Sequence, residues 1–322
     1  MFRRRLIIES KIEKNHQEKV TFVKTHSASM VNLYEILKNN PGISRQLSCK
    51  DLLFTNYDCP QAEAKQRFFI ECNHITYVIS GRRIFHKDNK TWDLKKGVCV
   101  FVKKGTHIAE KEEGEGWCVM VFFMPDNFLR QIINENRKSL PLANLPEADM
   151  EHVLPLDVNE LSTSFFSSML PYFSQVPPPP ENLIELKFKE LILSLLSNKK
   201  NQRFLSYLNN LSNDKSPSME EIMQNNYAFK LSLTEYAKLT CKSIPTFKRD
   251  FKKIFKETPA KWVMKKRLNL AADLLQNTAL SVGEITFECG FENQTHFSRV
   301  FKEKMGESPL QFRTKLHTIQ PG

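Results

Sequence analysis

The stretch LSLTEYAKLTCKSIPTFKRDFKKIFKETPAKW, residues 231–262, decides the fold of the last third of the chain. It recurs as LSVGEITFECGFENQTHFSRVFKEKMGESPLQF at residues 280–312. A Ser-x-x-Glu pair begins each copy, at Ser232 and at Ser281. This spacing predicts a capping box, in which the serine and the glutamate satisfy backbone N–H groups at the start of a helix. Self-similarity over this length indicates two copies of one structural unit.

Each copy has the pattern of a short helix, a turn and a second helix, which is the arrangement of a helix-turn-helix. In the second copy Gly290 suits a left-handed position after the first helix, and Asn293 can cap the second helix. In the first copy Cys241 and Ser243 occupy these places. The sequence therefore predicts two helix-turn-helix units.

A long helix predicted over 259–278 joins the two units, which we place at about 231–255 and 280–305. Its apolar residues recur at helical spacing and are Trp262, Val263, Leu268, Ala271, Ala272, Leu274 and Leu275. We expect this helix to hold the two units at a fixed distance.

The second helix of each unit has one face that is predicted to pack into the core. The residues of this face are Ile244, Phe247, Phe251 and Ile254 in the first unit and Phe297, Phe301 and Met305 in the second. Their spacing of three and four residues places them on one side of a helix.

Another face of these helices combines Arg and Lys with short hydrogen-bonding side chains, and we expect it to carry no carboxylate. It consists of Pro245, Lys248, Arg249 and Lys252 in the first unit and Gln294, Thr295, Ser298, Arg299 and Lys302 in the second. This composition suits a DNA major groove, where Arg binds guanine, Gln binds adenine, Thr meets the thymine methyl and Lys meets phosphate. We predict that all nine residues contact DNA, with Lys252 and Lys302 on phosphate.

The charge of the chain is concentrated in the same region. The net charge is +11, and residues 215–322 contribute +7 of it, from 18 Lys and Arg against 11 Asp and Glu. A basic surplus in one part of a chain favours a polyanionic partner. The first residues, MFRRRLIIESKIEKNH, are too poor in apolar residues for a signal peptide, and no apolar run could span a membrane. The seven cysteines show no paired spacing, and we expect reduced thiols in a cytoplasm.

The chain before residue 215 has a different texture. Residues 51–125 contain β-branched and aromatic runs separated by glycines, which is typical of an antiparallel barrel or sandwich. Helical periodicity follows over 126–214 and is interrupted by the prolines of 177–180. The apolar faces of these helices could cover the barrel or meet a second copy of the protein. We expect an α+β protein with a β-barrel domain and an all-α domain at 215–322, and the role of residues 1–50 is open.

Residues 218–315 resemble the AraC/XylS family of bacterial transcription regulators. The motif reads R-L-x-x-A-x-x-L-L over 267–275, I-x-x-x-x-G-F-x-x-x-x-x-F-x-R-x-F-K over 285–302 and G-x-S-P-x-x-F-R over 306–313. The resemblance implies that the second helices enter successive major-groove segments on one face of double-stranded DNA. The chain departs from the family pattern at four positions. These are Cys241 and Lys256, where glycine is common, Thr286, where alanine is usual, and Pro245, where family members often reach a base.

Residues 75–112 resemble the cupin-like sensing domain of many family members and lie nearest to regulators of type III secretion, which answer to a protein partner. The resemblance implies a transcription regulator that is not an enzyme, uses no cofactor or metal and works with RNA polymerase. It also implies an effector, either a small molecule or a protein, at the N-terminal domain. The apolar stripes of 161–173 and 183–196 motivate a homodimer built by this helical region.

Two other classes of function stay open at this point. A cupin-type metalloenzyme needs several histidines and a carboxylate on neighbouring strands, whereas His74, His86 and His107 are scattered in the sequence without a His-x-His pair. Cys289 and His296 are close in sequence, but His296 is off the face predicted to read DNA, and we expect no metal pair there. A basic protein without sequence preference would bind nucleic acid with an affinity that follows charge alone.

Overall fold

The computed structural model describes residues 30–58, 64–87, 90–112, 116–147, 151–213 and 217–318, with side chains up to residue 315. The chain divides into two compact parts, residues 1–216 and residues 217–322, here called the N-terminal body and the C-terminal body. Residues 1–29, most of the segment 1–50, lie outside the described residues. Cys59 also lies outside them.

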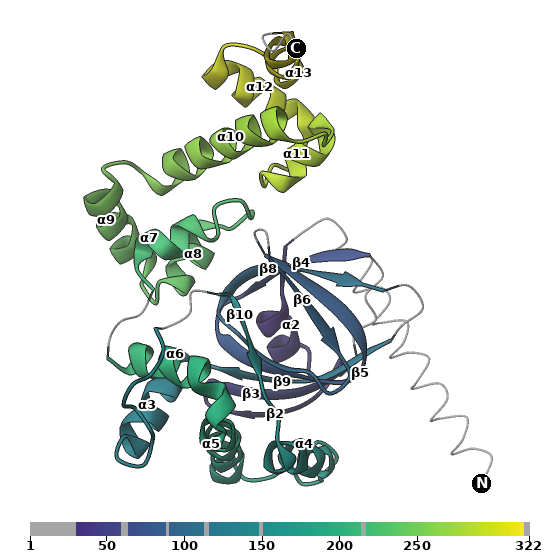
Figure 1. Cartoon of the computed structure of the whole chain (residues 1–322), viewed down its shortest axis with the longest axis vertical. Coiled ribbons are helices and arrows are strands. Elements are labelled where there is room, and N and C mark those ends of the chain that lie inside the picture. The colour runs from purple at the N-terminus through teal and green to yellow at the C-terminus, as the bar shows by residue number, and fades with distance from the viewer. Residues whose placement is uncertain are drawn as a thin grey trace, which may run out of the picture. The chain divides into compact units, whose positions relative to one another are not determined.

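A curled sheet forms the centre of the N-terminal body (Figure 1). Its hydrogen-bonded order is β1-β4-β8-β5-β9-β3-β2, while β6 pairs with β5, and β7 pairs with β5 and β10. The described pairs are antiparallel except for β1 with β4. The strands are β1 (Val31–Asn32), β2 (Arg45–Cys49), β3 (Leu52–Asp58), β4 (Lys65–Ile70), β5 (Asn73–Lys87), β6 (Lys90–Lys95), β7 (Cys99–Val102), β8 (Gly105–Lys111), β9 (Trp117–Met124) and β10 (Val153–Leu156).

The sheet draws on residues outside 51–125, the range that the sequence suggested for it. β1, β2 and the short helix α2 (Leu33–Asn39) precede this range, and β10 follows it. Tyr34 and Leu37 of α2 are buried in the core of the sheet. The described part of residues 1–50 therefore belongs to the barrel.

The strand β9 is apolar along most of its length because both faces of the sheet are covered. Alternate residues of a strand point to opposite faces. Met120 and Phe122 accordingly enter one hydrophobic cluster, and Val121 and Phe123 enter another. Burial on both sides replaces the polar–apolar alternation of a half-exposed strand with a continuous apolar run.

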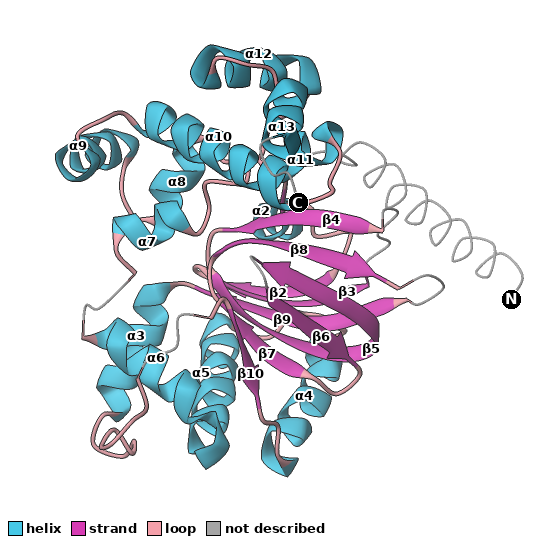
Figure 2. Cartoon of the chain, turned by 45° about the horizontal axis from the view of Figure 1, so that its top comes forward, coloured by secondary structure: helices cyan, strands magenta, loops and turns pink. Residues whose placement is uncertain are grey.

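Four helices cover one face of the sheet (Figure 2). They are α3 (Asp126–Asn136), α4 (Glu160–Tyr172), α5 (Glu181–Ser197) and α6 (Gln202–Ser212), with a 3-10 turn at Lys199–Asn201. Phe188 of α5 stacks on Phe54 of β3 with ring centroids 3.7 Å apart. Phe166 of α4 stacks on Tyr77 of β5 at 4.0 Å. The apolar stripes of α4 and α5 are thus used to cover the sheet of the same chain.

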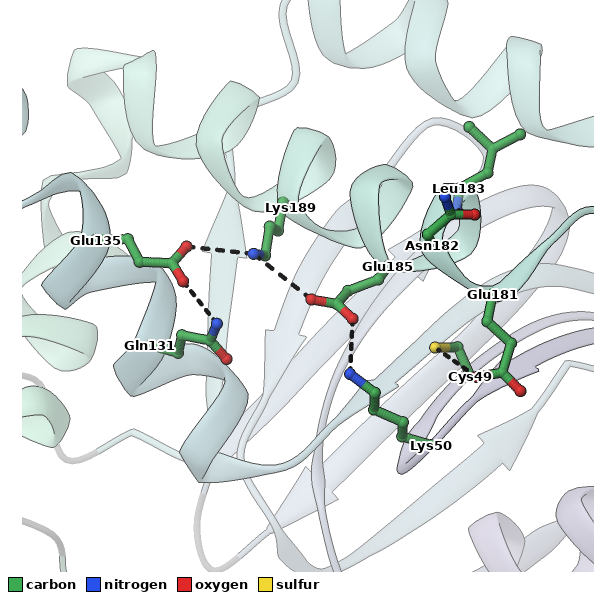
Figure 3. A network of polar contacts seen from close by, with 9 residues as sticks. All are labelled: Cys49, Lys50, Gln131, Glu135, Glu181, Asn182, Leu183, Glu185 and Lys189. Carbon is green, nitrogen blue, oxygen red and sulfur yellow. Dashed lines mark hydrogen bonds and ion pairs between the residues drawn. The ribbon is translucent and has the colours of Figure 1, made fainter.

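A line of ion pairs also connects α5 to the edge of the sheet and to α3 (Figure 3). Lys50, directly after β2, pairs with Glu185 at 3.0 Å, and Glu185 lies 3.5 Å from Lys189. Lys189 reaches Glu135 of α3 at 3.3 Å. Solvent-accessible pairs contribute at most about 1 kcal/mol each, so the apolar contacts provide most of the energy that holds these helices.

In the described residues of the C-terminal body, the regular secondary structure consists of helices joined by turns and loops. Its helices are α7 (Met219–Gln224), α8 (Leu233–Leu239), α9 (Ile244–Phe255), α10 (Pro259–Asn277), α11 (Val282–Glu288), α12 (Gln294–Met305) and α13 (Pro309–Thr318). Two hydrophobic clusters form, and the described residues assigned to one are absent from the other. The long helix α10 gives Trp262 to the first cluster and Leu268, Ala271 and Leu275 to the second.

Candidate nucleic-acid interface

In the first helix-turn-helix, α8 leads through a short turn into α9. Ser232 Oγ accepts a hydrogen bond from the Glu235 N–H at 3.2 Å, and the Glu235 side chain accepts from the Ser232 N–H at 2.6 Å. Cys241 has φ 54°, the left-handed conformation expected at this turn. Ser243 caps α9 by accepting from the Thr246 N–H at 3.4 Å. The predicted helix, turn and helix are confirmed.

The second helix-turn-helix repeats this geometry with α11 and α12. Ser281 and Glu284 form the corresponding capping box, with bonds of 3.2 and 2.7 Å. Gly290 has φ 75° in the turn. Asn293 Oδ1 accepts from the His296 N–H at 2.7 Å and so begins α12. Local hydrogen bonding by the residues of the repeat therefore positions both second helices.

The predicted core face of these helices is correct in its centre and wrong at both ends of α9. The fully buried residues are Phe247, Phe251, Phe297 and Phe301. Ile244 and Ile254, which the spacing predicts to lie in the core, are 36% and 42% exposed. The core stripe of α9 runs from the buried Phe247 and Phe251 to the partly buried Phe255, at intervals of four residues. Ile244 lies at the helix start, beyond this stripe, and Ile254 lies at its flank.

The nine residues predicted to contact DNA lie on accessible parts of α9 and α12. Eight are exposed and Ser298 is half-buried; the exposed ones are Pro245, Lys248, Arg249, Lys252, Gln294, Thr295, Arg299 and Lys302. Helical geometry turns them away from the buried phenylalanines of the same helix. The structure thus groups each set on one helix face, and their contact with DNA stays a prediction.

The nine residues of these faces include no carboxylate, but a neighbouring acid reaches the arginine of each face. Arg249 Nε lies 3.3 Å from Asp250 Oδ1, and Arg299 Nη1 lies 3.1 Å from Glu303 Oε1. Asp250 also pairs with Lys242 at 2.9 Å, and the hydrogen bond from Lys242 holds the pKa of this carboxyl below its usual range. The acids sit just beyond the predicted face, but side chains of this length reach across it.

Two departures from the family pattern are accommodated locally. Lys256 ends α9 with φ 58°, a left-handed position that costs a non-glycine residue about 1 kcal/mol. Thr286 is fully buried, and its hydroxyl donates to the Val282 carbonyl at 2.7 Å within α11. The extra hydroxyl therefore has a partner inside the helix.

Histidines come together inside the curled sheet, which the sequence did not predict. The ring of His107 lies 6.5 Å from that of His74 and 5.7 Å from that of His152. Burial lowers the pKa of His74 to about 3 and lowers the pKa of both other imidazoles well below its usual value. All three are therefore neutral at pH 7. They lie on β5, β8 and the segment before β10, and only the fold brings them together.

No described group of three or more His, Cys, Asp or Glu side chains is placed to hold a metal ion. Cys289 is fully buried in the core of the second helix-turn-helix, whereas His296 is exposed. Among the described helices, none combines the length and the hydropathy that a membrane crossing requires.

Comparison with known proteins matches each body to a family model. Residues 73–207 match the ExsA N-terminal regulatory domain, and residues 236–315 match a helix-turn-helix domain. The first match agrees with the resemblance to regulators of type III secretion, and the second covers most of the repeat.

Relatives extend over both bodies. The virulence regulon transcriptional activator VirF of Yersinia enterocolitica is 24% identical over 75% of this chain and 89% of its own length. The HTH-type transcriptional regulator ExsA of Pseudomonas aeruginosa is 20% identical over 74% of this chain and 85% of its own. A solved structure of ToxT from Vibrio cholerae is 12% identical, covers 82% of this chain and 98% of its own, and has a TM-score of 0.37. From the two domain matches and the relatives that span both bodies, the chain belongs to the AraC/XylS family of DNA-binding transcription regulators.

Proposed function

We propose that the protein reads a bipartite operator by placing α9 and α12 in successive major-groove segments of double-stranded DNA. The observation that carries this proposal is the repetition of one interface. Both helix-turn-helix units of the C-terminal body present an exposed, cation-rich face on their second helix, started by a side-chain cap. A major groove admits one helix, and successive grooves on one side of DNA repeat about every 34–36 Å.

The residues of the two faces take different roles. Arg249 and Arg299 have guanidinium groups that can fork onto a guanine edge, and Gln294 can bind adenine in the same way. Lys252 and Lys302 supply phosphate contacts, which fix the position of each helix but read no sequence. Pro245 offers only an apolar contact, so readout by α9 depends on Lys248 and Arg249. The remaining contacts of α12 come from Thr295 and Ser298.

The test is binding to a duplex that the wild-type chain selects from a random library, compared at fixed salt with a shuffled duplex of the same length. Specific binding should exceed non-specific binding by at least about 10³-fold. Arg299→Ala should reduce the affinity for the selected duplex and relax the preference at one base position. Lys265→Ala removes a positive charge from an exposed position on α10 and should leave the base preference unchanged. Equal affinity of the wild-type chain for both duplexes would support a binder without sequence preference.

The N-terminal body supports a regulatory role. A cavity of about 40 Å³ lies inside the curled sheet, and its lining includes His74, Arg83, His107 and Trp117. Residues 73–207 match the ExsA N-terminal regulatory domain, which supports a regulatory signal, either a small molecule or a protein, that acts on this body.

Other properties follow from this function as proposals. A regulator that acts on bacterial operators works in the cytoplasm, engages RNA polymerase and needs no catalytic activity, cofactor or metal. The name of VirF favours activation over repression. A homodimer is the remaining proposal. Since α4 and α5 bury most of their apolar residues against their own sheet, it depends on the apolar side chains that stay exposed, Leu161, Leu170 and Leu186.

A further inference from the structure

A single arginine connects both halves of the C-terminal body. Arg267 lies in the middle of α10 and is partly buried. Its guanidinium donates three hydrogen bonds to main-chain carbonyls. The acceptors are Tyr227 at 2.7 Å, Phe229 at 2.7 Å and Gly290 at 3.0 Å. Tyr227 and Phe229 lie between α7 and α8, beside the first helix-turn-helix, whereas Gly290 is in the turn of the second.

The two segments that Arg267 joins also touch each other directly. A Cβ atom built on Gly290 would lie 2.5 Å from the Ala228 carbonyl oxygen and 3.1 Å from Arg267 Cζ. Gly290 is therefore required here for close approach as well as for its φ of 75°. At the surface of the same junction, Lys230 forms an ion pair with Glu292, which belongs to the turn that follows Gly290.

This junction can fix the relative orientation of the two helix-turn-helix units, which their hydrophobic cores do not. The first helix-turn-helix packs around Phe247, Phe251 and Trp262, and the second around Leu268, Phe297 and Phe301. Since the two clusters have separate members among the described residues, no common apolar core fixes their relative orientation. The backbone of α10 and the contacts around Arg267 must do so.

We propose that Arg267 is a positioning residue for DNA recognition, because it fixes the separation of α9 and α12 and thereby the half-site spacing that the protein accepts. The inference rests on the proposed reading of DNA by these two helices. Arg267 itself needs no contact with DNA. Its fork matches three carbonyls that converge from two segments, and the single ammonium group of a lysine cannot reproduce that arrangement.

The test uses the duplex selected by the wild-type chain and derivatives with two base pairs inserted or removed between the half-sites. The wild-type chain should lose at least about tenfold in affinity when the spacing changes, since one helix then leaves its groove. Arg267→Lys keeps the charge and should bind the altered duplexes within about threefold of the selected one. Lys265→Ala on the same helix is the control and should keep the wild-type ratio.

The outcomes separate this inference from the function on which it rests. If the wild-type chain shows no preference for a bipartite duplex, reading by two helices is wrong. If it has a spacing preference that Arg267→Lys retains in full, the positioning role is wrong. If circular dichroism shows that Arg267→Lys does not fold, variants of the ion pair between Lys230 and Glu292 test the proposal instead. Lys230→Glu should weaken the spacing preference, and adding Glu292→Lys should restore it, whereas an unchanged preference in both would overturn the proposal.

Discussion

Arg299 and Glu303 lie one turn apart on α12 and form an ion pair, with Arg299 Nη1 3.1 Å from Glu303 Oε1. Their side chains are 66% and 61% exposed, so the pair is easily exchanged for another partner. The relationship places a carboxylate beside the guanidinium that we predict to read guanine. DNA must therefore compete with Glu303 for Arg299, and the repulsion between Glu303 and phosphate opposes binding to any sequence.

Replacing Glu303 with Gln should raise the affinity for selected and shuffled duplexes alike. An exposed pair contributes about 0.2–1 kcal/mol, so the gain should be about 1.5- to fivefold. Fluorescence anisotropy at fixed salt measures it. Glu220→Gln removes the same charge from α7 and is the control. A gain of equal size from Glu220→Gln would show that net charge, and not release of Arg299, is responsible.

Two carboxylates, Glu303 and Asp250, pair with the arginines that we predict to read DNA. The sequence could have indicated the contact of Glu303 but not the full set of contacts of Asp250. Arg299 and Glu303 have the i, i+4 spacing at which helical side chains meet, so their pair was predictable. Asp250 is also held by Lys242, which precedes α9. That contact depends on how the turn folds back on the helix, and periodicity carries no information about it. The prediction that Ile244 and Ile254 are buried is wrong for a related reason, since spacing alone cannot show where a core ends.

The buried phenylalanines of α12 should dominate the stability of the second helix-turn-helix. Phe297 is fully buried, and Phe297→Ala should lower the free energy of unfolding by about 3–5 kcal/mol, because it removes apolar burial and leaves a cavity. Phe287 is 53% exposed on α11 and provides the control, for which the loss should stay below about 1 kcal/mol. Denaturant unfolding followed by circular dichroism measures both. Similar losses for the two variants would contradict the assigned core.

Replacing the left-handed residue at the end of α9, Lys256, should increase the stability of the protein. Lys256→Gly relieves the steric cost of φ 58° and should raise the free energy of unfolding by about 1 kcal/mol. Lys253→Gly, an exposed position inside the same helix, should lower it by about 1 kcal/mol instead. Thermal unfolding of the two variants gives opposite shifts in Tm if the backbone conformation at Lys256 is as described. Destabilisation by both glycines would count against it.

The N-terminal body shows what sequence patterns cannot supply. The runs in β5, β7 and β9 predicted strands because β-branched and aromatic residues recur between glycines. The two-residue strand β1 has no such pattern, and β10 contains Pro155. Both are strands because a partner is present, β4 in one case and β7 in the other. The meeting of His74, His107 and His152 is likewise a product of long-range pairing.

The proposed homodimer makes a prediction about α5. Leu186 is 59% exposed and lies on the side of α5 away from its buried residues. Leu186→Glu should shift the protein toward monomer in light scattering, because a charge in an apolar interface is costly. Leu310→Glu changes a leucine that is 65% exposed on α13 and should leave the assembly unchanged. A wild-type chain that is monomeric at every concentration would exclude the homodimer.

The buried histidines make the stability of the N-terminal body depend on pH. Burial lowers the pKa of His74 to about 3 and lowers those of His107 and His152 well below the usual value. In the unfolded chain each imidazole titrates near pH 6.5. The unfolded state therefore binds more protons below pH 6.5, so the stability is complete above this pH and is lost as the pH falls.

Well below pH 6.5 each histidine should remove about 1.4 kcal/mol of stability per pH unit, and three together about 4 kcal/mol. Denaturant unfolding of the N-terminal body at several pH values between 7 and 5 measures this slope. The carboxyl groups with lowered pKa, such as Asp93 and Asp157, titrate at lower pH and contribute little in this window.

His74→Leu should reduce the slope by about one third, because one proton fewer is taken up on unfolding. His296→Gln, an exposed change in the C-terminal body, should leave it unchanged, and a slope that His74→Leu does not alter would contradict the buried neutral state of His74.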